Sequence, residues 1–222
     1  MTITIAIVII TCLVSFTGFT QQKVIDDLIF YPPAISERRQ YYRFISHGFV
    51  HADVFHLVFN MIALYSFGTI VEKVFTFSCI FDKNGKLFYL ILYFTALIIA
   101  SLPDYFKYKD AYHFRSLGAS GAVSAVIFSS IVFTPQSGIS MLFLPVEIPG
   151  FVFGILYLAV SFYLDRRGGG KINHSAHFWG AAYGVAFTLV CCQLFSHGFD
   201  VYDNFVQQIH SLERILPIPC DD

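Results

Sequence analysis

Six apolar segments, separated by polar connections, constrain this chain more than any other feature of its sequence. They cover approximately Thr2–Thr20, Val54–Val71, Leu87–Leu102, Ala119–Phe133, Ile148–Leu164 and Ala176–Phe195. A helix needs about 20 apolar residues to cross a hydrocarbon layer of roughly 30 Å, and most of these segments come close to that length. They lack the polar–apolar alternation of membrane barrel strands. The pattern predicts an all-α integral membrane protein with six transmembrane helices.

The composition supports this fold class and argues against other functions. Only 13% of the 222 residues are charged, and the mean hydropathy is +0.64, whereas soluble domains carry about 25% charged residues. The net charge of −1 provides no basic surface for nucleic acid. The cysteines follow no paired spacing, so the sequence predicts neither a disulfide framework nor a cysteine metal site. They are Cys12, Cys79, Cys191, Cys192 and Cys220.

The polar connections indicate how the chain is organised. We expect residues 1–196 to form one membrane domain and residues 197–222 to form a polar tail that contains a surface helix. The longest connection, residues 21–53, holds Pro32 and Pro33, which interrupt any continuous helix. The connection "DRRGGGKIN" has three consecutive glycines and is expected to be mobile. The fourth apolar segment is short and serine-containing, so we expect other helices to surround it.

Polar side chains open the second, fourth and sixth segments, and such side chains are costly inside a bilayer. They are His51, His56 and Asn60 in "HADVFHLVFN", Ser120 in "GASG", and His174 and His177 in "HSAHFWG". In a protein with six spans, the even-numbered helices all enter the membrane from the same side. The sequence therefore predicts that these side chains meet in one polar pocket just below one membrane surface.

A serine and a histidine in such a pocket are the minimum set for covalent acyl transfer. The imidazole removes the hydroxyl proton as the oxygen attacks a carbonyl, and it later returns a proton to the leaving amine. Ser120 at a helix start also lies beside unpaired backbone N–H groups, which suit a developing oxyanion. The small residues Gly118, Ala119 and Gly121 leave room for a substrate backbone.

The same residues have alternative interpretations. Glycines such as Gly180 and Gly184 in membrane helices usually serve helix packing, and an intramembrane histidine often has a structural role. A histidine-lined metal or proton transporter is a further alternative. The sequence lacks the HExxH zinc motif, and such transporters are expected to carry acidic residues within their spans.

The residues resemble those of the rhomboid intramembrane serine proteases. The likeness rests on "HADVFHLVFN", on "GTIVEK" at the end of the second segment, on "GASG", and on "AHFWGAAYG", in this order. It covers roughly Arg38 to Phe195 and implies a six-transmembrane-helix rhomboid-like bundle. It also implies a serine endopeptidase, without cofactor or metal, whose partners are the lipid bilayer and membrane-protein substrates with weakly helical transmembrane segments.

The resemblance implies a role for each matched residue. Ser120 would be the nucleophile and His177 the general base. His56, Asn60 and the Ser120 N–H would form the oxyanion site. The residues expected to support the structure are His51, Arg43, Glu72, Gly118, Gly121 and Gly180. The fifth helix and the "RRGGGK" loop would act as gate and cap.

The chain departs from the family pattern at several positions. The Trp-Arg pair common in the first loop is Tyr42-Arg43 here. Four residues after the nucleophile, many members have a tyrosine that packs against the catalytic ring, but this chain has Ser124. The position three residues before His177 is His174. The alternative within the family is a pseudoprotease that binds membrane clients, although such relatives typically lack the serine or the histidine.

The family orientation conflicts with the distribution of basic residues. The resemblance implies a cytoplasmic N-terminus and an active site toward the outer face, and we expect a bacterial inner membrane. Ten of the fourteen Lys and Arg residues would then lie in the outer connections, against the usual cytoplasmic bias of basic residues. We favour the family orientation because acidic residues accompany many of these cations. They are Asp26, Asp27, Glu37 and Asp53.

Overall fold

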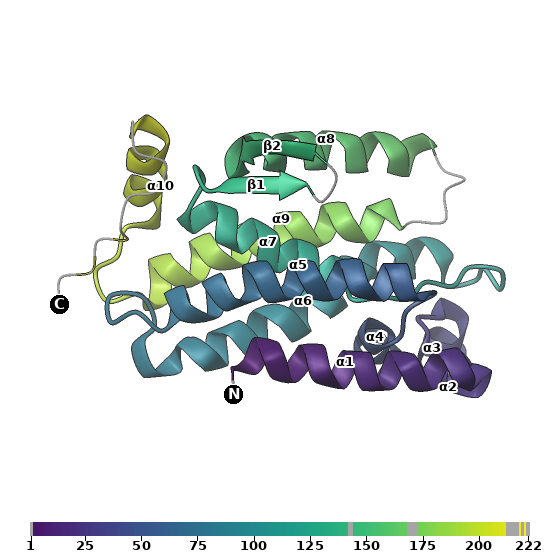
Figure 1. The fold of residues 1–222 in the computed structure, drawn as a ribbon. Helices are drawn as coiled ribbons and strands as arrows, with labels where there is room; N and C mark the ends of the chain where they lie inside the picture. Colours follow the sequence, from purple (N-terminus) through teal and green to yellow (C-terminus); the bar gives the residue numbers. More distant parts are fainter. Residues whose placement is uncertain (1, 142–143, 168–172, 212–217, 219, 221–222) are drawn as a thin grey trace.

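Helices form at all of the apolar segments that the sequence predicts to be membrane-spanning (Figure 1). The computed structural model describes residues 2–141, 144–167, 173–211, 218 and 220. The helices at these segments are α1 (Ile3–Thr20), α5 (Val54–Phe75), α6 (Gly85–Tyr108), α7 (Ser120–Phe133), α8 (Gly150–Arg167) and α9 (His174–Phe195). The predicted all-α membrane bundle is therefore confirmed.

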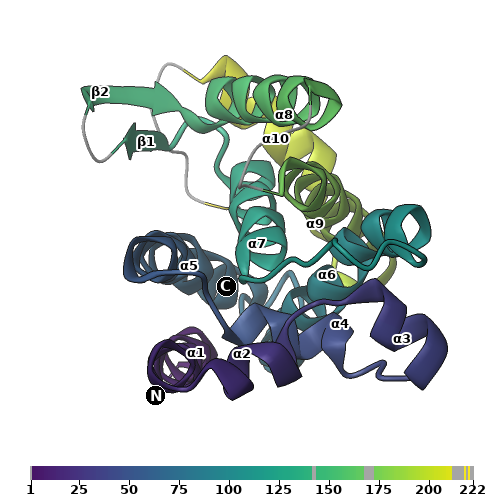
Figure 2. The same ribbon diagram turned by 90° about the vertical axis from the view of Figure 1, so that its right-hand side faces the viewer.

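The number of membrane spans stays a prediction. Within the described residues, four helical stretches are long and apolar enough to cross a membrane: α1, α5, α9 and the stretch Asp82–Tyr108 that ends with α6. The helix α7 is apolar but has only 14 residues. Every residue of α7 after Ser120 is buried, and α7 lies at the centre of the bundle with α5, α6 and α9 around it (Figure 2). The prediction that other helices surround the fourth segment is confirmed.

The end of α6, the start of α8 and one hairpin differ most clearly from the sequence prediction, while α5 and α8 extend three to four residues beyond their predicted ends. The helix α6 continues through Pro103 to Tyr108, because proline has a φ angle suited to a helix and neighbouring helices can make up for its missing hydrogen bond. The predicted fifth span began at Ile148, but Ile148 belongs to β2 (Leu144–Pro149), which pairs antiparallel with β1 (Gly138–Met141). Prolines at both ends of the stretch 145–149 disfavour a helix there, so α8 begins only at Gly150.

The long connection after α1 folds into short helices beside α6 (Figure 2). They are α2 (Gln22–Leu28), α3 (Pro32–Arg38), α4 (Arg43–Ser46) and the 3-10 helix η1 (His47–Phe49); another 3-10 helix, η2 (Asp82–Asn84), precedes α6. Pro32 and Pro33 begin α3, a position where the missing N–H of proline costs nothing. The buried Arg43 guanidinium donates to the Asp26 and Ile29 carbonyl oxygens at 3.0 and 2.7 Å. Arg43 thus joins two parts of this connection, and the structural role that the resemblance implies for it stays a prediction.

The C-terminal tail packs against the bundle at the opposite end from this connection (Figure 1). Its helix α10 (Val201–His210) confirms the expected tail helix, and the Asn204 side chain donates to the Phe133 carbonyl oxygen at the end of α7 (3.1 Å). Cys79 and Cys220 form a disulfide with a Cα–Cα distance of 5.3 Å. The expectation of no disulfide was wrong, because the two cysteines are 141 residues apart and only the fold brings them together.

Small residues let α7 and α9 touch along their length. A Cβ atom at Gly180 would collide with the Gly121 carbonyl oxygen, and one at Gly184 would collide with the Ala125 carbonyl oxygen. One turn further, the hydroxyl groups of Thr188 and Ser129 share a 2.8 Å hydrogen bond. The residue numbers of the contacting positions increase in the same direction along both helices. The helices α7 and α9 are therefore parallel and begin at the same end. The packing role expected for Gly180 agrees with this geometry.

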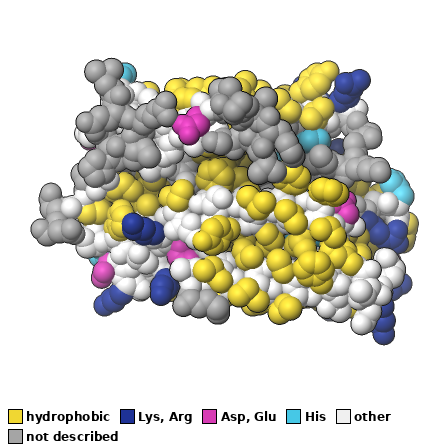
Figure 3. Space-filling view, in the orientation of Figure 1, with side chains coloured by type: hydrophobic (Ala, Val, Ile, Leu, Met, Phe, Trp, Pro, Cys, Tyr) yellow, Lys and Arg dark blue, Asp and Glu magenta, His cyan; other side chains and the backbone are white. Residues whose placement is uncertain are grey.

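The surface is that of an integral membrane protein. Large hydrophobic side chains are exposed along α1 and α5, and Figure 3 shows them covering the middle of this face, with basic side chains toward the two ends. These exposed residues include Ile9, Ile10, Leu13 and Phe16 on α1 and Phe55, Val58, Ile62 and Tyr65 on α5. A soluble protein rarely exposes so large a continuous apolar area.

Candidate active site

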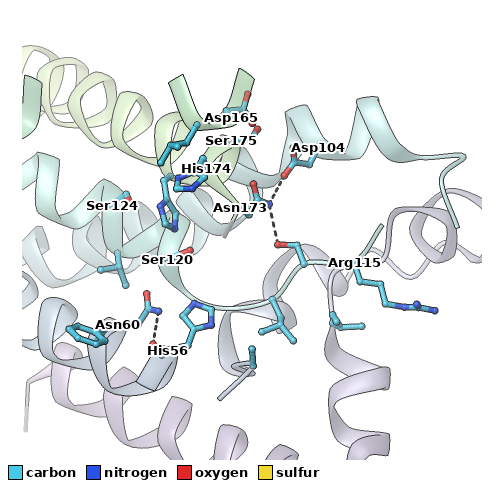
Figure 4. A pocket seen from close by; sticks show the side chains of 18 of the residues that line it. His56, Asn60, Asp104, Arg115, Ser120, Ser124, Asp165, Asn173, His174 and Ser175 are labelled. Atoms are coloured by element: carbon cyan, nitrogen blue, oxygen red, sulfur yellow. Dashed lines mark hydrogen bonds between the residues drawn. The ribbon is translucent and has the colours of Figure 1, made fainter. Parts of the chain in front are cut away.

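The residues predicted to carry the chemistry line one cavity of about 990 Å³. His56 and Asn60 come from the first turns of α5, Ser120 begins α7, and His177 lies in the first turn of α9. Figure 4 shows His56 and Asn60 on one side of Ser120, with His174 on the other side. The starts of α5, α7 and α9 therefore meet, as the sequence predicts, although His51 does not line the cavity and the number of spans stays a prediction.

Ser120 is placed by a short extended stretch that precedes α7. Phe30 and Ser116 form an isolated antiparallel bridge, and the Gly118 N–H donates to the His47 carbonyl oxygen at 2.9 Å. The chain then turns at Gly118, whose φ of +110° suits only glycine. The long connection after α1 thus holds the residues before Ser120 from outside the bundle.

The His56 ring lies directly against this turn. The Asp53 side chain caps α5 by accepting the His56 N–H at 2.8 Å. A Cβ atom at Gly118 would lie 2.6 Å from His56 Cε1. The expected support role of Gly118 thus has a concrete form, because only a residue without a side chain leaves space for the imidazole.

Asn60 presents an amide to the same cavity. Its side-chain N–H donates to the His56 carbonyl oxygen, one turn earlier in α5, at 2.9 Å. An amide NH₂ group has two protons, so this bond orients the group and leaves a second N–H for another acceptor. The residue is buried and lines the cavity together with Ser120.

His51 has the contacts of a structural residue. The Ser15 hydroxyl donates its proton to the Phe49 carbonyl oxygen at 2.9 Å, so the His51 Nδ1–H must be the donor in its 2.9 Å bond to Ser15 Oγ. His51 Nε2 is then free to accept the Ala119 N–H at 3.4 Å. Burial lowers the pKa of His51 to about 3, which keeps the ring neutral in this arrangement. His51 thereby ties α1 to the residue before Ser120.

Glu72 and Gly121 also lie where a structural role requires them. The Glu72 carboxylate accepts the first N–H groups of α1, from Ile3 and Thr4, at 2.8 and 2.9 Å, and also the Thr4 hydroxyl. It thus caps α1 from the far end of α5. Gly121 lies against Ala100 of α6 and Ala176 of α9, so a larger residue there would push three helices apart.

His177 is held through ring contacts. The Tyr157 ring from α8 stacks on it, with centroids 6.1 Å apart and an interplanar angle of 22°, and the His174 ring meets it edge-on at 5.9 Å. The hydrogen bonds of the described residues do not include one between Ser120 Oγ and His177. Such bonds are often long in enzymes without substrate.

A polar network that the sequence analysis missed connects the elements around the site. The Asn173 side chain caps α9 by accepting the Ala176 N–H at 3.0 Å. Its amide donates to Asp104 Oδ2 of α6 at 2.6 Å and to Ser116 Oγ at 3.1 Å (Figure 4). An asparagine just before an apolar run is a typical helix start signal, and it could have been recognised. The partner of this asparagine could not, since Asp104 is 69 residues away.

The expected cap of the site lies largely outside the described residues. Of the "RRGGGK" loop, Arg166 and Arg167 end α8, whereas residues 168–171, including the three glycines predicted to be mobile, are not among the described residues. The expected gate, α8, is described and contributes Tyr157, Leu164, Asp165 and Arg166 to the cavity wall.

Comparisons with known proteins agree with this arrangement. A sequence model of the Rhomboid domain matches residues 38–194. Relatives include the mitochondrial RHOMBOID-like protein 12 of Arabidopsis thaliana, 32% identical over 62% of this chain and 43% of its own length. The mitochondrial presenilin-associated rhomboid-like protein of Rattus norvegicus is 30% identical over 62% of this chain and 34% of its own length. Rhomboid protease GlpG of Haemophilus influenzae is 25% identical over 84% of this chain and 90% of its own length.

Proposed function

The chain belongs to the rhomboid family, and from this premise we propose that it is an intramembrane serine endopeptidase with a Ser120–His177 dyad. The observation that carries the proposal is the shared cavity at the starts of α5, α7 and α9. It gathers a hydroxyl, an imidazole and two side chains with N–H donors. The chain spans less than half the length of the two mitochondrial relatives described above, so their activities are not carried over to it.

The proposed reaction proceeds through an acyl-enzyme. Ser120 Oγ attacks the carbonyl carbon of the scissile bond while His177 takes the hydroxyl proton, and the negative charge develops on the carbonyl oxygen. The Ser120 N–H at the start of α7, with His56 and Asn60, would donate to that oxygen. His177 then protonates the leaving amine. A water molecule, deprotonated by the same imidazole, attacks the acyl carbon; the bond from this carbon to Ser120 Oγ breaks, and His177 returns the proton to Ser120 Oγ.

The location of the cavity supports a proposal for the substrate class. A polar cavity enclosed by helices brings water to a bond inside the bilayer without exposing backbone groups to lipid. The bond must be reached in an extended chain, so we propose that substrates are membrane proteins whose transmembrane helix is weak near the outer interface. Small residues at the scissile bond suit the crowded turn before Ser120.

A fluorophosphonate probe tests the nucleophile. We expect the purified protein in detergent to be labelled, and labelling to disappear in Ser120→Ala and to fall strongly in His177→Ala. Ser130→Ala is the matched control, because Ser130 is buried in the same helix and is not part of the cavity wall. Labelling that persists in Ser120→Ala contradicts the assignment. A wild-type protein that remains unlabelled and cleaves no transmembrane substrate favours the alternative, a pseudoprotease that binds membrane clients.

The oxyanion site has its own test. Replacing His56 or Asn60 with Ala should lower kcat by about 10- to 1000-fold if each donates to the oxyanion. The thermal stability of each variant, measured in the same detergent, separates this effect from loss of structure. A variant that loses stability but keeps its turnover number would show that the side chain only supports the fold.

The protein is an integral membrane protein, and we propose that its cavity opens toward the outer face of the membrane. The expected bacterial inner membrane is not part of this proposal, because the matched relatives are mitochondrial as well as bacterial.

A further inference from the structure

The structure contains a tyrosine at the catalytic ring, but it comes from a different helix than the family pattern predicts. The position four residues after Ser120 is Ser124, which has no ring to pack against His177. The ring that packs against His177 belongs to Tyr157, in the middle of α8. Its ring lies nearly parallel to the His177 imidazole, with 6.1 Å between the centroids.

A hydrogen bond and two aromatic contacts define the position of the Tyr157 ring. Its hydroxyl shares a 2.6 Å hydrogen bond with Ser124 Oγ, and Ser124 is only 2% exposed. Phe128 of α7 and Phe153 of α8 contact the ring at centroid distances of 5.6 and 5.7 Å. The side chain is thus fixed at its hydroxyl end by α7 and along its ring by packing.

Ser124 and Tyr157 complement each other in size and chemistry. Ser124 is small, so space remains beside His177 for a ring from another helix. Its hydroxyl also supplies the partner that a half-buried tyrosine O–H requires. The serine at position 124 therefore makes room for the tyrosine at position 157 and also binds its hydroxyl group.

We propose that Tyr157 is the positioning residue of His177, held against the imidazole by its hydrogen bond to Ser124. The proposal rests on the proposed function of His177 as general base. Tyr157 acts through His177, because a stacked ring limits rotation of the imidazole.

The location of Tyr157 couples the base to the movement of α8. The buried residues of α8 are Gly150, Gly154 and Ser161, and the helix lies at the edge of the bundle (Figure 2). A displacement of α8 away from α7 would break the Ser124 bond and withdraw the ring from His177. Entry of a substrate past α8 and orientation of the base are therefore linked by one side chain.

Kinetic analysis of three variants tests the positioning role. Tyr157→Leu removes the ring and should lower kcat by about 2- to 10-fold, the range expected for one aromatic pair, while KM stays unchanged. Tyr157→Phe and Ser124→Ala each remove the same hydrogen bond, so each should give a smaller loss, and their combination should not exceed the larger single effect. Tyr183→Phe is the matched control, because it removes a 2.7 Å bond to Thr95 outside the cavity.

A chemical probe of His177 provides a readout that does not depend on protease activity. Diethyl pyrocarbonate modifies exposed imidazole nitrogens, and mass spectrometry measures its rate at His177. We expect the rate to rise in Tyr157→Leu by a factor similar to the loss in kcat, and to stay at the wild-type value in Tyr183→Phe.

The outcomes separate this inference from the proposed function. Equal kcat and equal His177 modification in Tyr157→Leu and Tyr183→Phe would overturn the inference in an active enzyme. A change confined to KM would identify Tyr157 as a substrate contact instead. If the wild-type protein has no activity, the proposed function fails, but the modification rate still decides whether Tyr157 shields and orients His177.

Discussion

At the scale of single residues, the site depends most on the absence of a side chain at position 118. Gly118 has a φ of +110°, and a Cβ atom there would lie 2.6 Å from His56 Cε1. Both constraints meet at a residue two positions before Ser120. Changes at this turn would therefore reach the nucleophile and the oxyanion site together.

We expect Gly118→Ala to lower kcat by about 100-fold, the effect of losing one oxyanion donor, because the new methyl group displaces His56. Cleavage of a transmembrane substrate by the purified variant measures this loss. Gly198→Ala is the control: Gly198 also has a positive φ, +93°, but nothing lies within 4 Å of its Cβ position. Equal losses in the two variants would mean that backbone strain, and not the His56 collision, is responsible.

The buried histidines of the long connection predict how stability depends on pH. Burial lowers the pKa of His47 to about 4 and that of His51 to about 3, whereas both titrate near about 6.5 in the unfolded chain. Between these pH values each histidine binds a proton only in the unfolded chain. The free energy of unfolding is therefore highest above about pH 6.5 and falls as the pH drops. At pH 5 the loss is about 2 kcal/mol for each histidine.

Thermal unfolding in detergent at pH 7.5 and pH 5 measures this dependence. We expect His51→Gln to be less stable than the wild type at pH 7.5 but to lose less stability on acidification. His113→Gln, which changes an exposed histidine, is the control for replacing a histidine elsewhere in the chain. An unchanged acid response in His51→Gln would contradict the burial of His51 as a neutral imidazole.

At the scale of elements, the seam between α7 and α9 sets the distance between Ser120 and His177. Gly180 follows His177 by less than one turn and touches the backbone of Gly121, the residue after Ser120. The helices cannot approach with a side chain at this contact, because the atom opposite is a backbone oxygen that cannot rotate away.

We expect Gly180→Ala to abolish most cleavage and to slow labelling of Ser120 by the fluorophosphonate, since the new methyl group forces α9 away from α7. Gly154→Ala provides a comparison at the α7–α8 contact, where the nearest atoms belong to the Phe128 side chain at 3.3 Å and can move. That variant should keep most of its activity. A similar result for both would show that close backbone contact is not what places the dyad.

At the scale of the whole molecule, the orientation in the membrane decides between the family topology and the charge distribution. Tyr112 and Tyr202 are 61% and 69% exposed and lie at opposite ends of the bundle, after α6 and in α10 (Figure 1). We expect Tyr112→Cys to react with a membrane-impermeant maleimide on intact bacterial expression hosts, and Tyr202→Cys to react only after permeabilisation. Both variants are made in a chain whose five native cysteines have been replaced, so that the maleimide reacts only with the introduced cysteine. The reverse pattern would show that the basic residues stay in the cytoplasm.

The sequence predicts the parts of this molecule that follow from the bilayer and from helix counting. Apolar length locates the helices, and the common start of α5, α7 and α9 brings His56, Ser120 and His177 to one cavity. Apolar length and helix counting do not predict which residues far apart in the sequence come into contact. The Ser124–Tyr157 bond depends on how α8 is rotated. The disulfide from Cys79 depends on the path of the tail. The catalytic role of Ser120 and His177 stays a prediction.

The shortness of α7 makes lipid chain length a variable of the reaction. Its 14 residues cover about 21 Å, roughly 9 Å less than the hydrocarbon thickness of an average bilayer. Ser120 begins this helix, and the other helices separate it from the lipid, so its depth is set by how those longer helices settle in a bilayer of a given thickness. In shorter-chain lipids the hydroxyl meets a substrate nearer to the headgroups, and in longer-chain lipids it meets one deeper in the acyl region. The position at which a given substrate is cut should therefore shift along its helix when the lipid is changed.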